Sequence, residues 1–210
     1  MFYPVPRLSL SQDEIDAFRR RAADAAIGLF ARDGYAAVTM RSVADALGVS
    51  PMTPYRYLAG KEALFGLVRA EAFRRFADRL EAALAKAGRD PTTRVDRLAR
   101  AYVDFALEQP DAYRIMFELS QPDPIGVDEL ATESRRAFRI LHRTVTEAVE
   151  ADALDGDPLT LAHLLWASTH GLVSLHLAGK LMMGRSLQQL AAAARARVLG
   201  TPRRAPRRKR

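Results

Sequence analysis

The chain has 210 residues, of which 49% are hydrophobic, and it carries a formal net charge of +7 with no cysteine. This composition allows a sizeable core, and the absence of cysteine excludes disulfide and thiolate chemistry. The sequence has no apolar stretch long enough to span a membrane and no pattern of a secretion signal, so we expect a cytoplasmic protein without membrane contact. Residues 1–75 carry net +3, residues 76–200 net −2 and residues 201–210 net +6, so only the first segment and the tail are expected to attract a polyanion.

The N-terminal region begins with an irregular segment and continues as a helix. Residues 1–10 contain two prolines and no helical period, and they are expected to form a flexible arm. Ser11 and Glu14 form a capping box, which predicts a helix from this point to about Asp33. Gly34 is expected to end that helix.

The next stretch predicts two short helices about a turn. Thr39 is a suitable N-cap, and an apolar stripe at helical spacing follows it up to Gly48, which can end the first helix in a left-handed conformation. Ser50 offers a second N-cap for a helix over residues 50–58. This is a helix-turn-helix pattern, whose second helix can enter a DNA major groove.

Pro54 disturbs the second of these helices. If Ser50 is the N-cap, residue 54 should donate the first intrahelical hydrogen bond, and proline has no N–H to donate. The alternative start has Thr53 as the N-cap and Pro54 at the first helical position. We therefore predict an irregular or late-starting first turn.

Two cations lie at the wrong ends of their predicted helices. Arg41 is in the first turn of one helix and Lys61 opens another, although the helix dipole disfavours a positive charge at the N-terminus. Stability alone explains neither position in the sequence. Nearby phosphates would explain both.

At these residues the sequence resembles the DNA-binding domain of the TetR family of bacterial transcription regulators. The resemblance rests on many spaced positions at which this sequence has the residue that is typical of the family. The departure from the family pattern is Pro54, where the family usually has an apolar residue other than proline. The matching positions are Ala22, Ala23, Leu29, Phe30, Gly34-Tyr35, Val38-Thr39, Arg41, Val43-Ala44, Leu47-Gly48-Val49-Ser50, Thr53, Tyr55, Tyr57 and Lys61-Glu62-Ala63-Leu64-Phe65.

The rest of the chain is also predicted to be helical. Cap-and-proline pairs at Asp90-Pro91 and Asp157-Pro158 mark two helix starts, and no segment favours a strand. The expected helices cover about residues 61–87, 91–108, a short stretch from Pro110, 127–152, 158–179 and 186–199, with a proline-rich loop at 120–126. The prediction is an all-α protein of about nine helices.

The expected organisation has two domains and a tail. A three-helix helix-turn-helix domain is expected over residues 11–60, and a C-terminal helical domain for ligand binding and dimerisation over residues 61–200. Residues 201–210 are too basic and too rich in proline to fold. This tail either adds non-specific DNA affinity or only improves solubility.

The C-terminal part resembles one domain class within the same family, which is named for its Trp-His-Gly pattern. The resemblance rests on residues 102–118 and on Trp166 with His170-Gly171. It implies a homodimer that packs residues 158–179 and 186–199 against a second copy, and a small-molecule effector bound among the C-terminal helices. It also implies that the helix over about 61–87 connects the two domains and transmits the ligand signal.

For double-stranded DNA, the resemblance implies a base contact by Arg41, with guanine as the natural partner. It places Thr39, Tyr55, Tyr57 and Lys61 at phosphate-contacting positions, whereas Met52, Thr53 and Arg56 could read bases. The alternatives are core packing for the tyrosines and an ion pair between Arg41 and Asp45. The full set of DNA-binding candidates is Thr39, Arg41, Ser50, Met52, Thr53, Tyr55, Arg56, Tyr57 and Lys61.

The candidates for a ligand pocket are aromatic, methionine and histidine residues of the C-terminal helices, which suit a plastic apolar pocket but also occur as plain core. They are Tyr102, Phe105, Met116, Phe117, His142, Trp166, His170 and Met182. His163, His170 and His176 share one helix, but no two of them are four residues apart, so neither a metal site nor a cofactor is expected.

The sequence as a whole predicts a homodimeric, ligand-responsive DNA-binding regulator, with repression as the expected mode. The alternative is a non-enzymatic architectural DNA-binding protein without a ligand. An enzyme is not expected, because the sequence has no nucleotide-binding glycine loop and no metal-ligand spacing. The operator, the regulated genes and the effector are not specified by the sequence.

Overall fold

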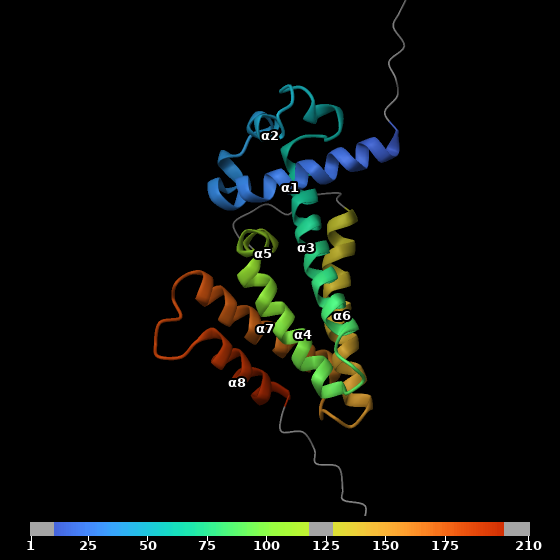
Figure 1. Cartoon of the computed structure of the whole chain (residues 1–210), viewed down its shortest axis with the longest axis vertical. Coiled ribbons are helices and arrows are strands. Elements are labelled where there is room, and N and C mark those ends of the chain that lie inside the picture. Colours follow the sequence, from blue (N-terminus) through green and yellow to red (C-terminus); the bar gives the residue numbers. More distant parts are fainter. Residues whose placement is uncertain (1–10, 118–127, 200–210) are drawn as a thin grey trace, which may run out of the picture.

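The computed structural model describes residues 11–117 and 128–199, which contain eight α-helices, one short 3₁₀ turn and no strand (Figure 1). The predicted all-helical fold is confirmed. The expected arm at 1–10, the loop at 120–126 and the tail at 201–210 lie outside the described residues. The elements are α1 Gln12–Ala37, α2 Met40–Leu47, η1 Pro54–Arg56, α3 Lys61–Ala85, α4 Pro91–Glu108, α5 Pro110–Phe117, α6 Asp128–Glu150, α7 Pro158–Leu177 and α8 Leu187–Leu199.

The predicted helix caps are confirmed at four helices. Ser11 caps α1 through the expected capping box with Glu14, and Thr39 caps α2 by accepting a hydrogen bond from the Ser42 amide at 3.1 Å. Asp90 and Asp157 cap α4 and α7 in the same way. Such caps satisfy amides that the first helical turn leaves without partners.

Gly34 marks the point where α1 loses its regular geometry. The helix continues to Ala37, but Gly34 has φ 76° and ψ 165°, which interrupts it with a kink. A positive φ of this size is available to glycine at little cost. The kink turns the chain from α1 toward α2.

The predicted helix over 50–58 is wrong, and this reduces the number of helices from nine to eight in the described chain. Only the 3₁₀ turn η1 forms, with Thr53 at the N-cap position and Pro54 as its first residue. Ser50 caps no helix; its carbonyl accepts a hydrogen bond from the Thr53 amide at 2.8 Å. The late start follows from the missing N–H of Pro54, as the sequence predicts.

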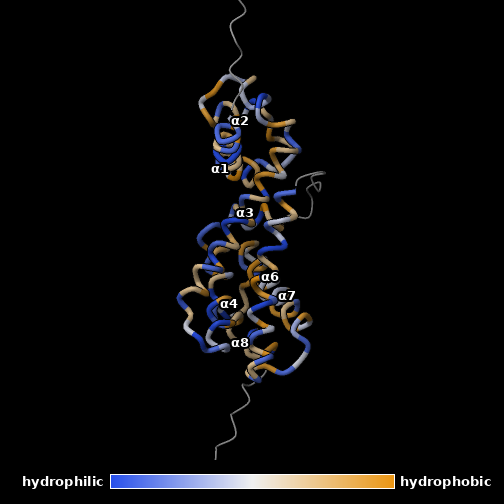
Figure 2. The backbone as a smooth tube through the Cα atoms, turned by 90° about the vertical axis from the view of Figure 1, so that its right-hand side faces the viewer, coloured by the Kyte–Doolittle hydropathy of each residue, from blue (hydrophilic) through white to orange (hydrophobic). Residues whose placement is uncertain are grey.

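The molecule is elongated, and α3 runs between its two ends (Figure 1, Figure 2). α1 lies across one end of α3 with α2 beyond it, while α6 runs alongside α3 toward the other end, where α4, α7 and α8 gather (Figure 1). One apolar core includes Leu64 and Phe65 from the start of α3 as well as Phe76 and Leu80 from its later turns. α3 is therefore packed into both ends of the molecule.

A second, smaller core lies where α4, α6 and α7 meet. It includes Val95, Val145 and Leu165, all nearly inaccessible to solvent.

Among the helices that the structure describes, none combines the length and the apolar character needed to cross a membrane.

Candidate functional site

The tip of the molecule formed by α2 and η1 presents several side chains to solvent. Arg41 and Arg56 are exposed, and the exposed fractions of Met52 and Tyr55 are 68% and 53%. Within the described part of the chain Arg41 has no ion pair, so the alternative of a pair with Asp45 is not observed. Four candidates for DNA contact are thus accessible to solvent at this tip.

The remaining candidates at this tip are partly occupied by intramolecular contacts. Thr39 is committed to the cap of α2. The ring of Tyr57 stacks on Phe18 of α1, with centroids 4.0 Å apart, so core packing accounts for Tyr57 but not for Tyr55. Ser50 is exposed and Thr53 is half-buried in the turn before η1.

Lys61 has partners that the sequence did not reveal. Its ammonium group donates a hydrogen bond to the carbonyl of Ala36 at 3.1 Å and lies 4.4 Å from the ring centroid of Tyr35. The carbonyl belongs to the C-terminal end of α1, where the helix dipole favours a cation. The interpretation that stability does not explain Lys61 is therefore wrong.

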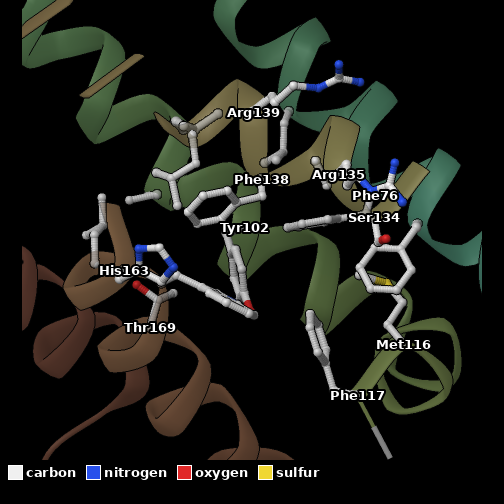
Figure 3. Close-up of a pocket in the computed structure, with 18 of the residues that line it drawn as sticks. Phe76, Tyr102, Met116, Phe117, Ser134, Arg135, Phe138, Arg139, His163 and Thr169 are labelled. Atoms are coloured by element: carbon white, nitrogen blue, oxygen red, sulfur yellow. The ribbon is translucent and has the colours of Figure 1, made fainter. Parts of the chain in front are cut away.

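A cavity of about 680 Å³ lies between α3, α4, α5, α6 and α7 (Figure 3). Four of the predicted pocket residues line it, namely Tyr102, Met116, Phe117 and Trp166. Its volume is in the ordinary range for small-molecule sites. Among the described residues no group of three or more metal-ligating side chains is placed to hold a metal ion.

The other four predicted pocket residues do not line the cavity. Phe105 is buried in the core, with its ring centroid 5.1 Å from that of Phe76. His142 lies beyond Phe138, with ring centroids 6.3 Å apart. His170 contacts Phe117 of the cavity wall, with ring centroids 4.7 Å apart, and Met182 is 81% exposed in the segment between α7 and α8.

Several lining residues were not predicted, and they come mainly from α3 and α6. Phe73 and Phe76 belong to an apolar stripe that the sequence presents as plain core, and Phe138 follows the same helical period on α6. A stripe at helical spacing does not distinguish a packed core from a cavity wall. The arginines of the lining carried no sequence signal, because charged side chains on a helix usually face solvent. Arg135 and Arg139 are themselves exposed, so they line the cavity where it meets solvent.

A chain of hydrogen bonds leads from the cavity wall to α7. The hydroxyls of Tyr102 and Tyr113 are 3.0 Å apart, and the Tyr113 hydroxyl is 2.7 Å from Nδ1 of His170. Nε2 of His170 is 3.4 Å from the Ser174 hydroxyl. Burial raises the pKa of Tyr102 well above its ordinary value and that of Tyr113 to about 12, and it lowers the pKa of His170. All three groups are therefore neutral near pH 7.

A second polar network begins between α1 and α3 and centres on Glu71, which is 8% exposed. Its carboxylate accepts two hydrogen bonds from Arg74, at 2.6 and 2.8 Å, and one from Arg75 at 2.8 Å. Arg75 also pairs with Asp24 of α1. Burial alone would raise the pKa of Glu71, but the hydrogen bonds from the two arginines outweigh burial and hold it below its ordinary value.

The same network continues to α6 through Asp78. Asp78 accepts from Arg74 at 2.9 Å and from Arg136 of α6 at 2.7 Å. Arg136 also bonds Glu81 at 2.6 Å and Glu133 at 3.1 Å, and the carboxylates of Glu81 and Asp78 raise its pKa. Ion pairs thus join the helix beside the α2–η1 tip to a helix of the cavity wall.

Comparisons with known proteins agree with this arrangement. Residues 23–68 match the family model described as bacterial regulatory proteins of the tetR family, and residues 95–198 match the tetracyclin repressor-like C-terminal domain. Together the two matched ranges cover well over half of the chain. Among proteins with curated descriptions, none matches this sequence.

Solved structures share the fold over nearly the whole chain. A protein from Rhodococcus sp. RHA1, described as having unknown function, is 26% identical, with a TM-score of 0.75 over 92% of this chain and 96% of its own. The fatty acid degradation regulator FadR from Bacillus halodurans is 17% identical, with a TM-score of 0.72 over 94% and 100%. A TetR family transcription regulator from Marinobacter aquaeolei VT8 is 20% identical, with a TM-score of 0.68 over 88% and 95%.

Proposed function

Because this chain belongs to the tetR family of bacterial regulatory proteins, we propose that it acts as a homodimeric repressor that a small ligand releases from a near-palindromic operator. Members of this family are transcription regulators and not enzymes. The observation that carries the proposal is the arrangement along α3: an accessible tip at one end and a cavity of about 680 Å³ at the other.

The proposed DNA contacts come from the α2–η1 tip. Arg41 reads a base edge, because its guanidinium is exposed and has no ion-pair partner in the described chain, and a guanine offers it two acceptors. Met52 and Arg56 are exposed in and just before η1, and they contact bases or thymine methyl groups. Tyr55 and Lys61 hold phosphates, which fix the position of the tip on the duplex. Thr39, Ser50 and Thr53 are further contacts of this surface, whereas Tyr57 packs against Phe18 and supports it from inside.

The proposed dimer is formed by α7 and α8. One face of α7 carries accessible small and apolar residues: Leu164 is 50% and Leu175 47% exposed, with the exposed Ala167 and the half-buried Gly171 between them. A Cβ atom added at Gly171 would have nothing within 4 Å beyond its own stretch of helix, so the glycine leaves room for a partner helix. Exposed alanines at 192, 193 and 196 give α8 a similar face.

The dimer is tested by placing a charge on this face. Leu175→Glu should convert the protein to a monomer in sedimentation and abolish specific DNA binding, because two linked tips are needed for two half-sites. Leu107→Glu, at a residue of α4 that is 36% exposed, is the matched control and should leave both properties unchanged. A Leu175→Glu variant that stays dimeric would refute the assignment of the interface.

The proposed release is a population shift between two conformations of the dimer. Residues of α3 line the cavity, and the same helix starts at the tip, so a ligand that favours one tilt of α3 changes the distance between the two tips. The test is DNA affinity measured by fluorescence anisotropy with and without a ligand that binds the cavity. An unchanged affinity with the cavity saturated would favour an architectural DNA binder.

A further inference from the structure

The lining of the cavity is unusual in its charge. Most of its residues are aromatic or aliphatic, but three arginines also line it, Arg69 from α3 and Arg135 and Arg139 from α6. No acidic side chain is part of the described lining. The cavity is therefore an apolar space with positive charge on its wall (Figure 3).

The arginines of α6 differ in whether they are paired. Arg136 bonds three carboxylates, as described above, and Arg143 pairs with Glu147 at 3.7 Å. Among the described residues, neither Arg135 nor Arg139 forms an ion pair or a hydrogen bond, and these two are the ones that line the cavity. Carboxylates therefore neutralise Arg136 and Arg143, whereas the charges of Arg135 and Arg139 at the cavity have no carboxylate partner among the described residues.

The two unpaired arginines also repel each other. Arg135 and Arg139 are four residues apart, so they occupy neighbouring positions on one face of α6, where like charges destabilise a helix. An anion placed between their guanidinium groups would remove this repulsion. It would also accept charge-assisted hydrogen bonds from planar donors that suit a carboxylate.

The apolar part of the cavity complements this charged edge. In Figure 3 Arg135, Ser134 and Arg139 lie along the α6 side, while Tyr102 projects from α4 and Phe117 from α5. We infer that the effector is an amphiphilic anion, with its negative headgroup held by Arg135 and Arg139 and its apolar body packed among the aromatic rings. This inference rests on the proposed role of the cavity as the effector site.

The inference is tested with three ten-carbon probes that differ in the headgroup: decanoate, decan-1-ol and decylamine, each kept below its solubility limit or critical micelle concentration. Trp166 is the single tryptophan of the chain and lines the cavity, so its fluorescence reports binding directly. Decanoate should bind about tenfold more tightly than decan-1-ol, because the two guanidinium groups donate charge-assisted hydrogen bonds to its carboxylate. Decylamine should bind more weakly than either.

Variants assign the preference to the two arginines. The double variant Arg135→Gln/Arg139→Gln should lose the preference for decanoate over decan-1-ol and keep the affinity for decan-1-ol. Arg143→Gln, at an exposed arginine of the same helix away from the cavity, should keep the preference. Equal binding of decanoate and decan-1-ol by the unaltered protein, no binding of any probe, or an equal effect of Arg143→Gln would overturn the inference.

A parallel measurement of DNA affinity separates this inference from the proposed function. If decan-1-ol releases DNA as well as decanoate does, the ligand-responsive function stands and the anionic class is refuted. If decanoate binds with the expected charge preference and leaves DNA affinity unchanged, the anionic class stands and release by the ligand is refuted.

Discussion

The buried carboxylate of Glu71 allows a quantitative prediction about the junction between α1 and α3. Replacement by glutamine keeps the size of the side chain and removes the charge that three hydrogen bonds from Arg74 and Arg75 depend on. Arg75 also holds Asp24 of α1. The change therefore weakens the attachment of α1 to α3 and leaves the apolar core as it is.

The expected size follows from the burial of the partners. Removing one member of a fully buried ion pair costs about 3–5 kcal/mol. Here the side chains of Arg74 and Arg75 are 44% and 31% exposed, so water can solvate the guanidinium groups once the charge is gone. We expect Glu71→Gln to lower the free energy of unfolding by about 2 kcal/mol, which corresponds to about 4–8 °C in Tm for a chain of this size.

The effect should depend on pH in one direction. The pKa of Glu71 is held below its ordinary value of 4.5 in the folded protein, so its stabilising contribution is present above the unfolded pKa and is lost as the pH falls through the folded pKa. The difference between Glu71→Gln and the unaltered protein should accordingly shrink below about pH 4.5.

Urea unfolding followed by circular dichroism at fixed protein concentration measures this difference. Glu108→Gln is the control, because Glu108 forms a surface pair with Arg79 and is 56% exposed; it should change stability by less than about 0.5 kcal/mol. A Glu71→Gln variant no less stable than Glu108→Gln would refute the reasoning.

Three further predictions concern the tip and the hydrogen-bond chain that leads from the cavity wall to α7. Arg41→Ala should weaken specific binding by about 1–3 kcal/mol and relax the preference at one base pair, measured by anisotropy on operator variants; an unchanged preference would exclude base reading. Lys61→Met should weaken binding to all sequences alike and lower Tm, since the contacts with Tyr35 and Ala36 are lost, and a change in base preference would contradict this. Burial lowers the pKa of His170 below its ordinary value of 6.5, so the unaltered protein should lose stability as the pH falls below about 6.5, and His170→Gln should lose less. Parallel profiles of stability against pH for the two proteins would rule out this role for His170.

The sequence predicted the elements whose signals are local. The caps at Thr39, Asp90 and Asp157 involve side chains that bond amides three residues later, so their effect can be read from the sequence. The effect of Pro54 is also local, because a missing N–H prevents a helix whatever surrounds it. The sequence could therefore predict α2 and the irregular start of the segment after it, but not that this segment forms only the 3₁₀ turn η1.

The sequence failed where the outcome depends on contacts between distant segments. Lys61 finds its carbonyl partner 25 residues earlier in the chain, and no local rule gives that contact. Phe76 and Phe105 have the same residue type and similar helical patterns, yet one lines the cavity and the other is plain core. Arg135 and Arg139 are exposed arginines of α6, and only the packing of α6 against α3, α4 and α7 places them at the wall of the cavity.

Sequence selectivity of the purified protein is the most direct test of the account. The measurement is selection of bound DNA from a random library at near-physiological salt. We predict an enriched near-palindromic motif whose half-sites are separated by one or more helical turns, each about 34–36 Å. Selection without an enriched motif, accompanied by a steep dependence of affinity on salt, would contradict a sequence-specific dimeric regulator.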